Sequence, residues 1–193
     1  MTSRHYKKDV LEIIETTADK IYTQKVSKPL HQIGANGVNG TLYDSNGSVM
    51  ILINNGELVG KNSYWNGWNS PPRPVIFYDG KLNYTKVKTV KELPSDAFWA
   101  VGGGSLPFGQ DENWGPDVTR KAERTAMAIK DDKVYLIATD VKLSLEELGD
   151  KIKEQLDPDH AIFLDGGGST QMFYDKAIIT SSRTVDNGIF VKE

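Results

Sequence analysis

The sequence contains no cysteine among its 193 residues, and it has neither a long apolar run nor a large excess of one charge. Without cysteine, disulfide bonds, thiolate catalysis and cysteine-ligated zinc sites are excluded. The polar start, residues 1–9, is not followed by the apolar segment of a signal peptide or a membrane span. We therefore expect a cytoplasmic protein without a membrane partner, with association to a virion or surface through a larger particle as the alternative.

The formal net charge is only −3, and both signs are mixed along the chain. Because no basic stripe stands out, nucleic acid is not an expected partner. The three histidines, His5, His31 and His160, lack the spacing of metal ligands, so packing or solvated roles are favoured over zinc. With 38% hydrophobic residues, a chain of this length can bury one core, which predicts a single domain.

The first 28 residues show helical periodicity. Apolar side chains recur at three- and four-residue intervals between polar ones, at Val10, Ile13, Ile14, Ala18 and Ile21. This spacing predicts an amphipathic helix over roughly residues 4–24, in a segment 1–28 that precedes the main domain, 29–193. The helix would cover one face of a sheet, or it would join copies of the chain into a homo-oligomer.

Short apolar runs and turn signals dominate from Pro29 onward. Residues 124–130 and 133–140 read as a strand, turn, strand unit, and Ser144 with Glu147 forms a capping box that opens a helix to about Gln155. An aromatic loop over residues 64–74 more often covers a core than binds a sugar ring. The order predicts an α+β fold, with a mixed or antiparallel sheet and flanking helices.

The most unusual stretch follows the apolar run 161–164. It leads into the acid Asp165, three glycines and two hydroxyl residues, and Gly102–Gly104 with Ser105 repeats the glycine triplet after another apolar run. Glycine triplets fill no core, so they are expected where the backbone lies close to a ligand. Their exposed amides would suit a phosphate or a sugar.

Five segments, in the same order, resemble the phosphodiester glycosidase family: Gly37–Tyr43, Arg124–Ala126, Asp140 after the next strand, Leu164–Ser169 and Arg183–Val191. The resemblance implies a hydrolase acting on a sugar 1-phosphodiester, with a small-molecule substrate of that kind or a nucleotide-like ligand. Thr41 and Leu42 depart from the glycine and aromatic residue that the family has there, which leaves the sugar unnamed. The first 25 residues show no such likeness.

Glycosyl transfer needs a carboxylate near the developing oxocarbenium ion, as nucleophile, electrostatic stabiliser or base. Asp165 is the first candidate and Asp140 the second, with Asp44 and Asp117 behind them. The separation of the carboxylates, which decides between retention and inversion, is not contained in the sequence. A divalent cation held by Asp165 is a further alternative, and no other cofactor is expected.

The leaving phosphate needs positive charge, for which Arg124 and Arg183 are the candidates. Structural ion pairs, Arg124 with Asp140 and Arg183 with Asp186, are the alternative roles. Substrate-binding candidates are the residues that offer amides, hydroxyls or bare backbone: Asn39, Gly40, Thr125, Gly102, Gly103, Gly104, Gly166, Gly167, Gly168, Ser169, Thr170 and Asn187.

Two other functions compete with this hypothesis. The string from Asp165 to Thr170 also resembles the phosphate loop of actin-like ATPases and sugar kinases, but that fold needs two large lobes and the chain shows no Gly-x-Gly-x-x-Gly fingerprint. Alternatively, the protein binds and sequesters a sugar phosphate or nucleotide-derived ligand without cleaving it.

Overall fold

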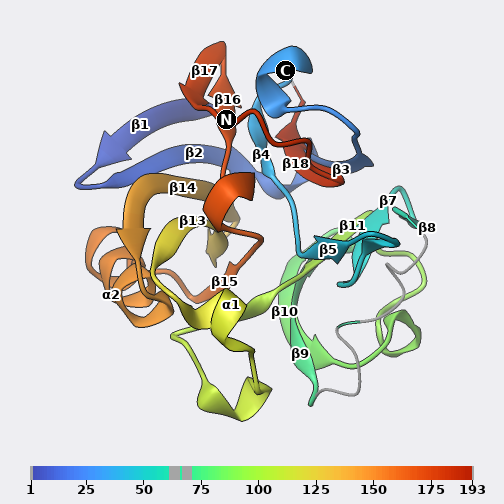
Figure 1. Cartoon of the computed structure of the whole chain (residues 1–193). Helices are drawn as coiled ribbons and strands as arrows, with labels where there is room; N and C mark the ends of the chain where they lie inside the picture. The colour runs from blue at the N-terminus through green and yellow to red at the C-terminus, as the bar shows by residue number, and fades with distance from the viewer. Residues whose placement is uncertain (1, 61–65, 67–70, 193) are drawn as a thin grey trace.

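The structure is a computed structural model that describes residues 2–60, 66 and 71–192 (Figure 1). Most of the aromatic loop over residues 64–74 lies outside this range. Within the described residues the protein is built mainly from antiparallel strands with few helices, as the sequence predicts. No helix in this part of the chain has the length and apolar character to cross a membrane.

Three larger sheets account for most of these strands. The six-stranded sheet has the spatial order β1 (Arg4–Lys8), β2 (Leu11–Thr17), β14 (Lys133–Leu143), β13 (Ala122–Lys130), β15 (His160–Phe163) and β12 (Gly104–Leu106). A five-stranded sheet has the order β10 (Leu82–Val87), β9 (Arg73–Tyr78), β11 (Trp99–Gly102), β7 (Leu52–Asn54) and β8 (Glu57–Leu58). The other five-stranded sheet has the order β17 (Lys176–Ile179), β16 (Met172–Tyr174), β4 (Gly37–Asn39), β18 (Asn187–Val191) and β3 (Ile21–Lys25).

Short elements connect the sheets. The strands β5 (Tyr43–Asp44) and β6 (Gly47–Ser48) pair to form a two-stranded antiparallel ribbon. The α-helices are α1 (Pro116–Thr119) and α2 (Leu145–Leu156), and the 3-10 turns are η1 (Ala18–Lys20), η2 (Leu30–Gln32), η3 (Val90–Glu92), η4 (Gln110–Glu112) and η5 (Gly167–Ser169). The capping box that opens α2 is confirmed, because Ser144 Oγ accepts from the Glu147 amide at 3.1 Å.

The six-stranded sheet is apolar on both faces. One face packs against α2 through residues such as Leu148, Ile152 and Phe163. The other face contributes to a second cluster that also contains side chains of both five-stranded sheets, among them Val38 and Ile76. Figure 1 shows α2 beside β13 and β14 at the left, with the five-stranded sheet that contains β16 and β18 at the top and the one that contains β9 and β10 at the lower right. The core is therefore layered, and β15 runs through it toward residue 165.

The predicted N-terminal helix is wrong. Residues 4–24 form β1, β2, η1 and the start of β3, and Asp9 turns the chain between the first two strands with φ of 52°. The strand β2 is buried on both faces, so apolar residues appear without the alternation that marks a half-buried strand. Its β-branched residues favour an extended backbone. Even Glu15 is buried there, paired with Arg4 at 2.8 Å and Lys133 at 3.0 Å.

This correction removes the reason for a separate segment over residues 1–28. The strand β2 pairs with β14, and β3 pairs with β18, so both strands belong to sheets of the main domain. The expected route to a homo-oligomer, a helical stripe in this segment, is absent from residues 2–28 as the structure describes them.

Gly104 provides a test of the packing. A Cβ atom at this position would lie 2.0 Å from two ring carbons of Phe163, which is fully buried beneath the strand. We predict that Gly104→Ala lowers the free energy of unfolding by about 1–3 kcal/mol, because the core cannot take the extra methyl group. Urea denaturation measures this. The matched variant Gly149→Ala lies in α2, with its nearest contact at 3.6 Å, and should be neutral or more stable.

Candidate functional site

Asp165 follows the end of β15, and a buried amide holds its backbone in place. Asn39, at the end of β4, donates from Nδ2 to the Asp165 carbonyl oxygen at 2.7 Å. Its Oδ1 accepts from Thr125 Oγ1 at 2.7 Å and from the Gln171 amide at 3.0 Å. The Asp165 amide donates to the carbonyl of Gly40 at 3.2 Å. Asn39 and Thr125 are therefore braces beneath the site, not groups that face a ligand.

The carboxyl group of Asp165 lies in an environment that disfavours its charged form. Burial raises its pKa from 3.8 to about 6, although a hydrogen bond with Ser169, the charge of Arg183 and the Gly166 amide all act in the opposite direction. The group therefore changes its charge near neutral pH, in the range where a catalytic acid or base is most effective.

Arg124 is buried without a carboxylate partner. Only 4% of the residue is exposed, and its Nε, Nη1 and Nη2 donate to the carbonyls of Leu143 (2.9 Å), Val118 (3.0 Å) and Arg120. Among the described residues no ion pair joins it to an acid, so the alternative pair with Asp140 does not form. Burial, and then the charge of Arg120, lower the pKa of Arg124, although the charges of Glu146 and Glu123 act in the opposite direction.

Arg183 lines the same pocket as Asp165, and its charge acts on the carboxyl group. It is exposed, and its Nη1 lies 3.5 Å from Ser169 Oγ. The alternative ion pair with Asp186 is not formed within the part of the chain that the structure describes, where Asp186 accepts from Asn187 Nδ2 at 3.3 Å. The hydroxyl of Tyr43 lies 3.4 Å from the same Ser169 Oγ and donates to the carbonyl of Thr184 at 3.1 Å.

The glycines after Asp165 form the tight turn η5. Gly167 has φ of 61°, a conformation that favours glycine, and the amides of Ser169 and Thr170 close the turn on the carbonyls of Gly166 (3.3 Å) and Gly167 (3.0 Å). Arg183 Nη1 lies 3.5 Å from the position that a Cβ on Gly168 would occupy. Side chains at this turn would therefore crowd the guanidinium group and the backbone near the carboxyl group.

These groups share one pocket of about 220 Å³. It is lined by the carboxyl, guanidinium and glycine groups described above and by their neighbours: Leu42, Tyr43, Asp117, Val118, Arg120, Ala122, Arg124, Leu164, Asp165, Gly166, Gly167 and Arg183. The sequence therefore identified Asp165, Arg124 and Arg183 as neighbours, and the structure brings them together.

Two polar side chains of the pocket lining were not among the residues predicted from the sequence. Arg120 follows α1 and adds a third guanidinium group, and Tyr43 adds a phenol beside Ser169. No local pattern marks Arg120, because it reaches the pocket only through the path of the 107–121 segment. Asp117, considered only as a weaker candidate, also lines the pocket, whereas Asp44 binds the amide of Asn46 in a turn at 2.7 Å.

Other candidates lie elsewhere. Asp140 is exposed on β14, outside the pocket lining, and its charge acts on Lys7. Asn187 is 1% exposed and accepts from the Thr41 amide at 2.8 Å. A Cβ on Gly40 would lie 2.0 Å from its Oδ1, so both residues serve packing. Thr170 is also buried, 3% exposed, behind the turn.

The second glycine triplet does not line the pocket. Gly102 ends β11 and Gly104 begins β12, and the amides of Gly102 and Gly103 donate to the carbonyls of Ile51 (2.7 Å) and Pro74 (3.1 Å). Its glycines are explained by close packing, since added Cβ atoms would lie within 2.4 Å of neighbouring atoms. The expected phosphate contacts of Gly102, Gly103 and Gly104 are therefore not supported.

The described residues contain no cluster of side chains that would hold a divalent cation. Within the described residues, no group of three or more histidine, aspartate or glutamate side chains is placed to hold a metal ion. Three guanidinium groups line the same pocket as Asp165, and their charge favours an anion.

A larger surface hollow of about 740 Å³ lies between β1, β2 and the end of α2. Its cations already have partners. Arg4 and Lys133 pair with Glu15, while Lys8 and Lys130 donate to the carbonyls of Gln155 (2.9 Å) and Leu156 (3.3 Å). The smaller pocket is therefore the stronger candidate, because its charges are less completely satisfied.

Comparison with known proteins identifies a family for this chain. The family described as phosphodiester glycosidase matches residues 21–192. The chain belongs to the phosphodiester glycosidase family. The match starts at the first residue of β3, so it excludes β1 and β2. Among curated proteins, the comparison finds no match.

Two solved structures of this fold are similar to the chain. The catalytic domain of zebrafish N-acetylglucosamine-1-phosphodiester alpha-N-acetylglucosaminidase, auto-inhibited by its pro-peptide, has a TM-score of 0.72 at 16% identity, covering 100% of this chain and 82% of that one. A hypothetical protein from Synechocystis has a TM-score of 0.56 at 15% identity, covering 98% and 61%. At such identities the likeness concerns the fold.

The raised pKa of Asp165 predicts a pH-dependent cost to stability. The unfolded chain ionises this group near pH 3.8 and the folded chain near 6, so the folded state loses stability as the pH rises through this range. We predict that Asp165→Asn is more stable than the wild type by about 1–3 kcal/mol at pH ~8 and equal to it at pH ~3.5. Urea denaturation at both values measures the difference, and an equal gain at both would contradict the prediction.

Proposed function

We propose that this protein is a hydrolase that cleaves a glycosidic bond next to phosphate, in a sugar 1-phosphodiester or a nucleotide-sugar-like substrate. The observation that carries the proposal is the buried charge of Arg124, which lines the pocket beside Asp165 and has only carbonyl partners among the described residues. Membership of the phosphodiester glycosidase family supports it.

A buried cation is costly unless an anion or strong hydrogen bonds compensate it. Arg124 uses three of the five N–H donors of a guanidinium group on carbonyls, which leaves two for a ligand. Arg120 and Arg183 line the same pocket and add positive charge. A phosphate group would neutralise the charge of these three arginines, since guanidinium groups bind phosphate oxygens in charge-assisted hydrogen bonds.

The carboxyl group of Asp165 would carry the second part of the reaction. As the bond between the anomeric carbon and the phosphate oxygen breaks, its electron pair stays on the phosphate, where the guanidinium groups stabilise the charge. A water molecule bonds to the anomeric carbon, and its proton passes to Asp165. A pKa of about 6 leaves this group ionised at neutral pH and ready to accept that proton.

The substrate class agrees with the name of a structural neighbour. The zebrafish protein is named for action on an N-acetylglucosamine 1-phosphodiester. The sugar in the present case is left open, because Leu42 lines the pocket where an aromatic residue was expected from the resemblance.

The proposal is tested with a panel of labelled glycosyl phosphodiesters and nucleotide sugars. We predict release of free sugar and phosphate compound by the wild type, and a fall in turnover on the order of 10²–10⁴-fold in Asp165→Asn. Asp150→Asn serves as the matched control, because this exposed carboxylate on α2 lies outside the pocket. Recovery of intact compounds that nevertheless bind would favour sequestration, and no binding across the panel would exclude both functions.

A further inference from the structure

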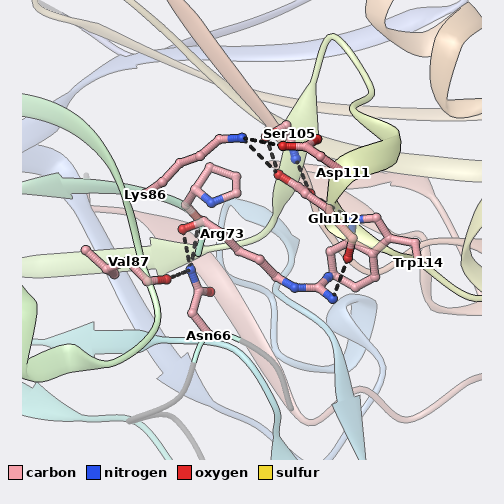
Figure 2. A network of polar contacts seen from close by, with 9 residues as sticks. Asn66, Arg73, Lys86, Val87, Ser105, Asp111, Glu112 and Trp114 are labelled. Atoms are coloured by element: carbon pink, nitrogen blue, oxygen red, sulfur yellow. Dashed lines mark hydrogen bonds and ion pairs between the residues drawn. The ribbon is translucent and has the colours of Figure 1, made fainter. Parts of the chain in front are cut away.

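Glu112 is a completely buried acid outside the pocket, at the end of η4. Its Oε2 accepts from the Ser105 amide at 3.0 Å and from Trp114 Nε1 at 2.8 Å, and its Oε1 accepts from Ser105 Oγ. Lys86 Nζ lies 3.5 Å from Oε1 (Figure 2). One carboxylate therefore holds its own loop to β12 and to β10.

Arg73 and Trp114 fix the same loop from a second direction. Arg73 on β9 donates from Nη2 to the backbone carbonyl of Glu112 at 3.0 Å, and its guanidinium carbon lies 3.3 Å from the ring centroid of Trp114 (Figure 2). The ring of Trp114 meets Phe163 edge-on at 5.1 Å, two residues before Asp165. Strands from two sheets thus determine where the loop lies.

The helix α1 begins two residues after Trp114, and it carries part of the pocket. Asp117, Val118 and Arg120 line the pocket, and the carbonyls of Val118 and Arg120 hold the guanidinium group of Arg124. The segment 105–120 is thus anchored at Glu112 and reaches the cations at its other end. Such a short helix is not stable alone, so its position depends on these anchors.

We propose that Glu112 is a positioning residue for the anion pocket, acting through α1 to place Arg120 and the carbonyl partners of Arg124. This inference rests on the proposed function, because it concerns the same pocket and its phosphate. Glu112 itself does not line the pocket. Its effect is therefore indirect, through the fixed path of residues 105–120.

The direction of the effect separates positioning from simple electrostatics. Replacing Glu112 with glutamine removes a negative charge, so a purely electrostatic influence would strengthen the binding of an anion. Positioning predicts the opposite result. In either orientation the NH2 group of the glutamine faces an N–H donor, which is Lys86 Nζ on one side and the Ser105 amide with Trp114 Nε1 on the other, so the loop shifts and the anion binds more weakly.

Inorganic phosphate is the probe, and its Kd is measured by calorimetry on the full chain. We predict that Glu112→Gln raises this Kd about tenfold, because small displacements of binding groups are costly. In an Arg120→Ala background the same substitution should raise the Kd clearly less than tenfold, since the part of its effect that passes through the Arg120 side chain is removed while the carbonyl partners of Arg124 remain. Asp150→Asn is the matched control, because this exposed acid on α2 lies outside both the network around Glu112 and the pocket, and it should leave the Kd unchanged.

Equal effects of Glu112→Gln in both backgrounds, or tighter binding in either, would overturn the positioning role while leaving the proposed function standing. Absence of phosphate binding in the wild type would also overturn the positioning role, whereas the proposed function stands or falls with the panel of glycosyl phosphodiesters. Thermal unfolding identifies variants that do not fold. If Glu112→Gln fails to fold, Trp114→Phe replaces it, because it removes one donor to the carboxylate and keeps an aromatic ring against Phe163. The same non-additivity with Arg120→Ala is then expected, and its absence would overturn the proposal.

Discussion

The side chain of Asn39 is the contact on which the site depends. It is 1% exposed, and its hydrogen bonds join the end of β4 to Thr125 on β13, to Gln171 and to the backbone of Asp165. A buried side-chain amide that lacks hydrogen-bond partners is costly. Each of these segments is therefore held where it completes the hydrogen bonds of Asn39. The backbone of Asp165, which carries the carboxyl group of the pocket, is thus held in place by the protein itself.

Two opposite shifts then define the electrostatics of the pocket. Burial raises the pKa of the Asp165 carboxyl group and lowers that of the Arg124 guanidinium group, so neither environment favours its charge. Many folded proteins would resolve this by pairing the two groups directly. Here Arg124 is held by backbone carbonyls, which do not neutralise it, so the charges of Arg124 and Asp165 remain available to a ligand. Preorganised charge of this kind is what a site for a charged transition state requires.

The sequence predicted those parts of the structure that local chemistry determines. The capping box of α2, the strand pair β13 and β14, and the turn after Asp165 all follow from patterns a few residues long. The helix over residues 4–24 failed because β2 is buried on both faces, which hides the alternation of a strand. Whether one face or both faces of a strand are covered depends on elements that are distant in the sequence, so the residues of the strand itself do not show it.

The residues of the candidate site also fall into those that the sequence predicted and those that it did not. Asp165, Arg124 and Arg183 were found through motifs, and Asn39 was found with the wrong role, because a buried brace and a ligand contact use the same residue type. Arg120 had no signal, since a network around Glu112 determines where α1 lies. The triplet Gly102–Gly104 was misleading, because close packing and exposure to a ligand both require glycine.

The same triplet has a mechanical consequence. The chain leaves β11 at Gly102 and enters β12 at Gly104, so one nearly continuous strand belongs to two sheets. The two sheets are thus tied together by a covalent crossing at Gly103. The groups at the edge of the pocket, Tyr43, Arg183 and α1, belong to short elements or connections outside this crossing, so the pocket can adjust to a bulky substrate there without separating the sheets.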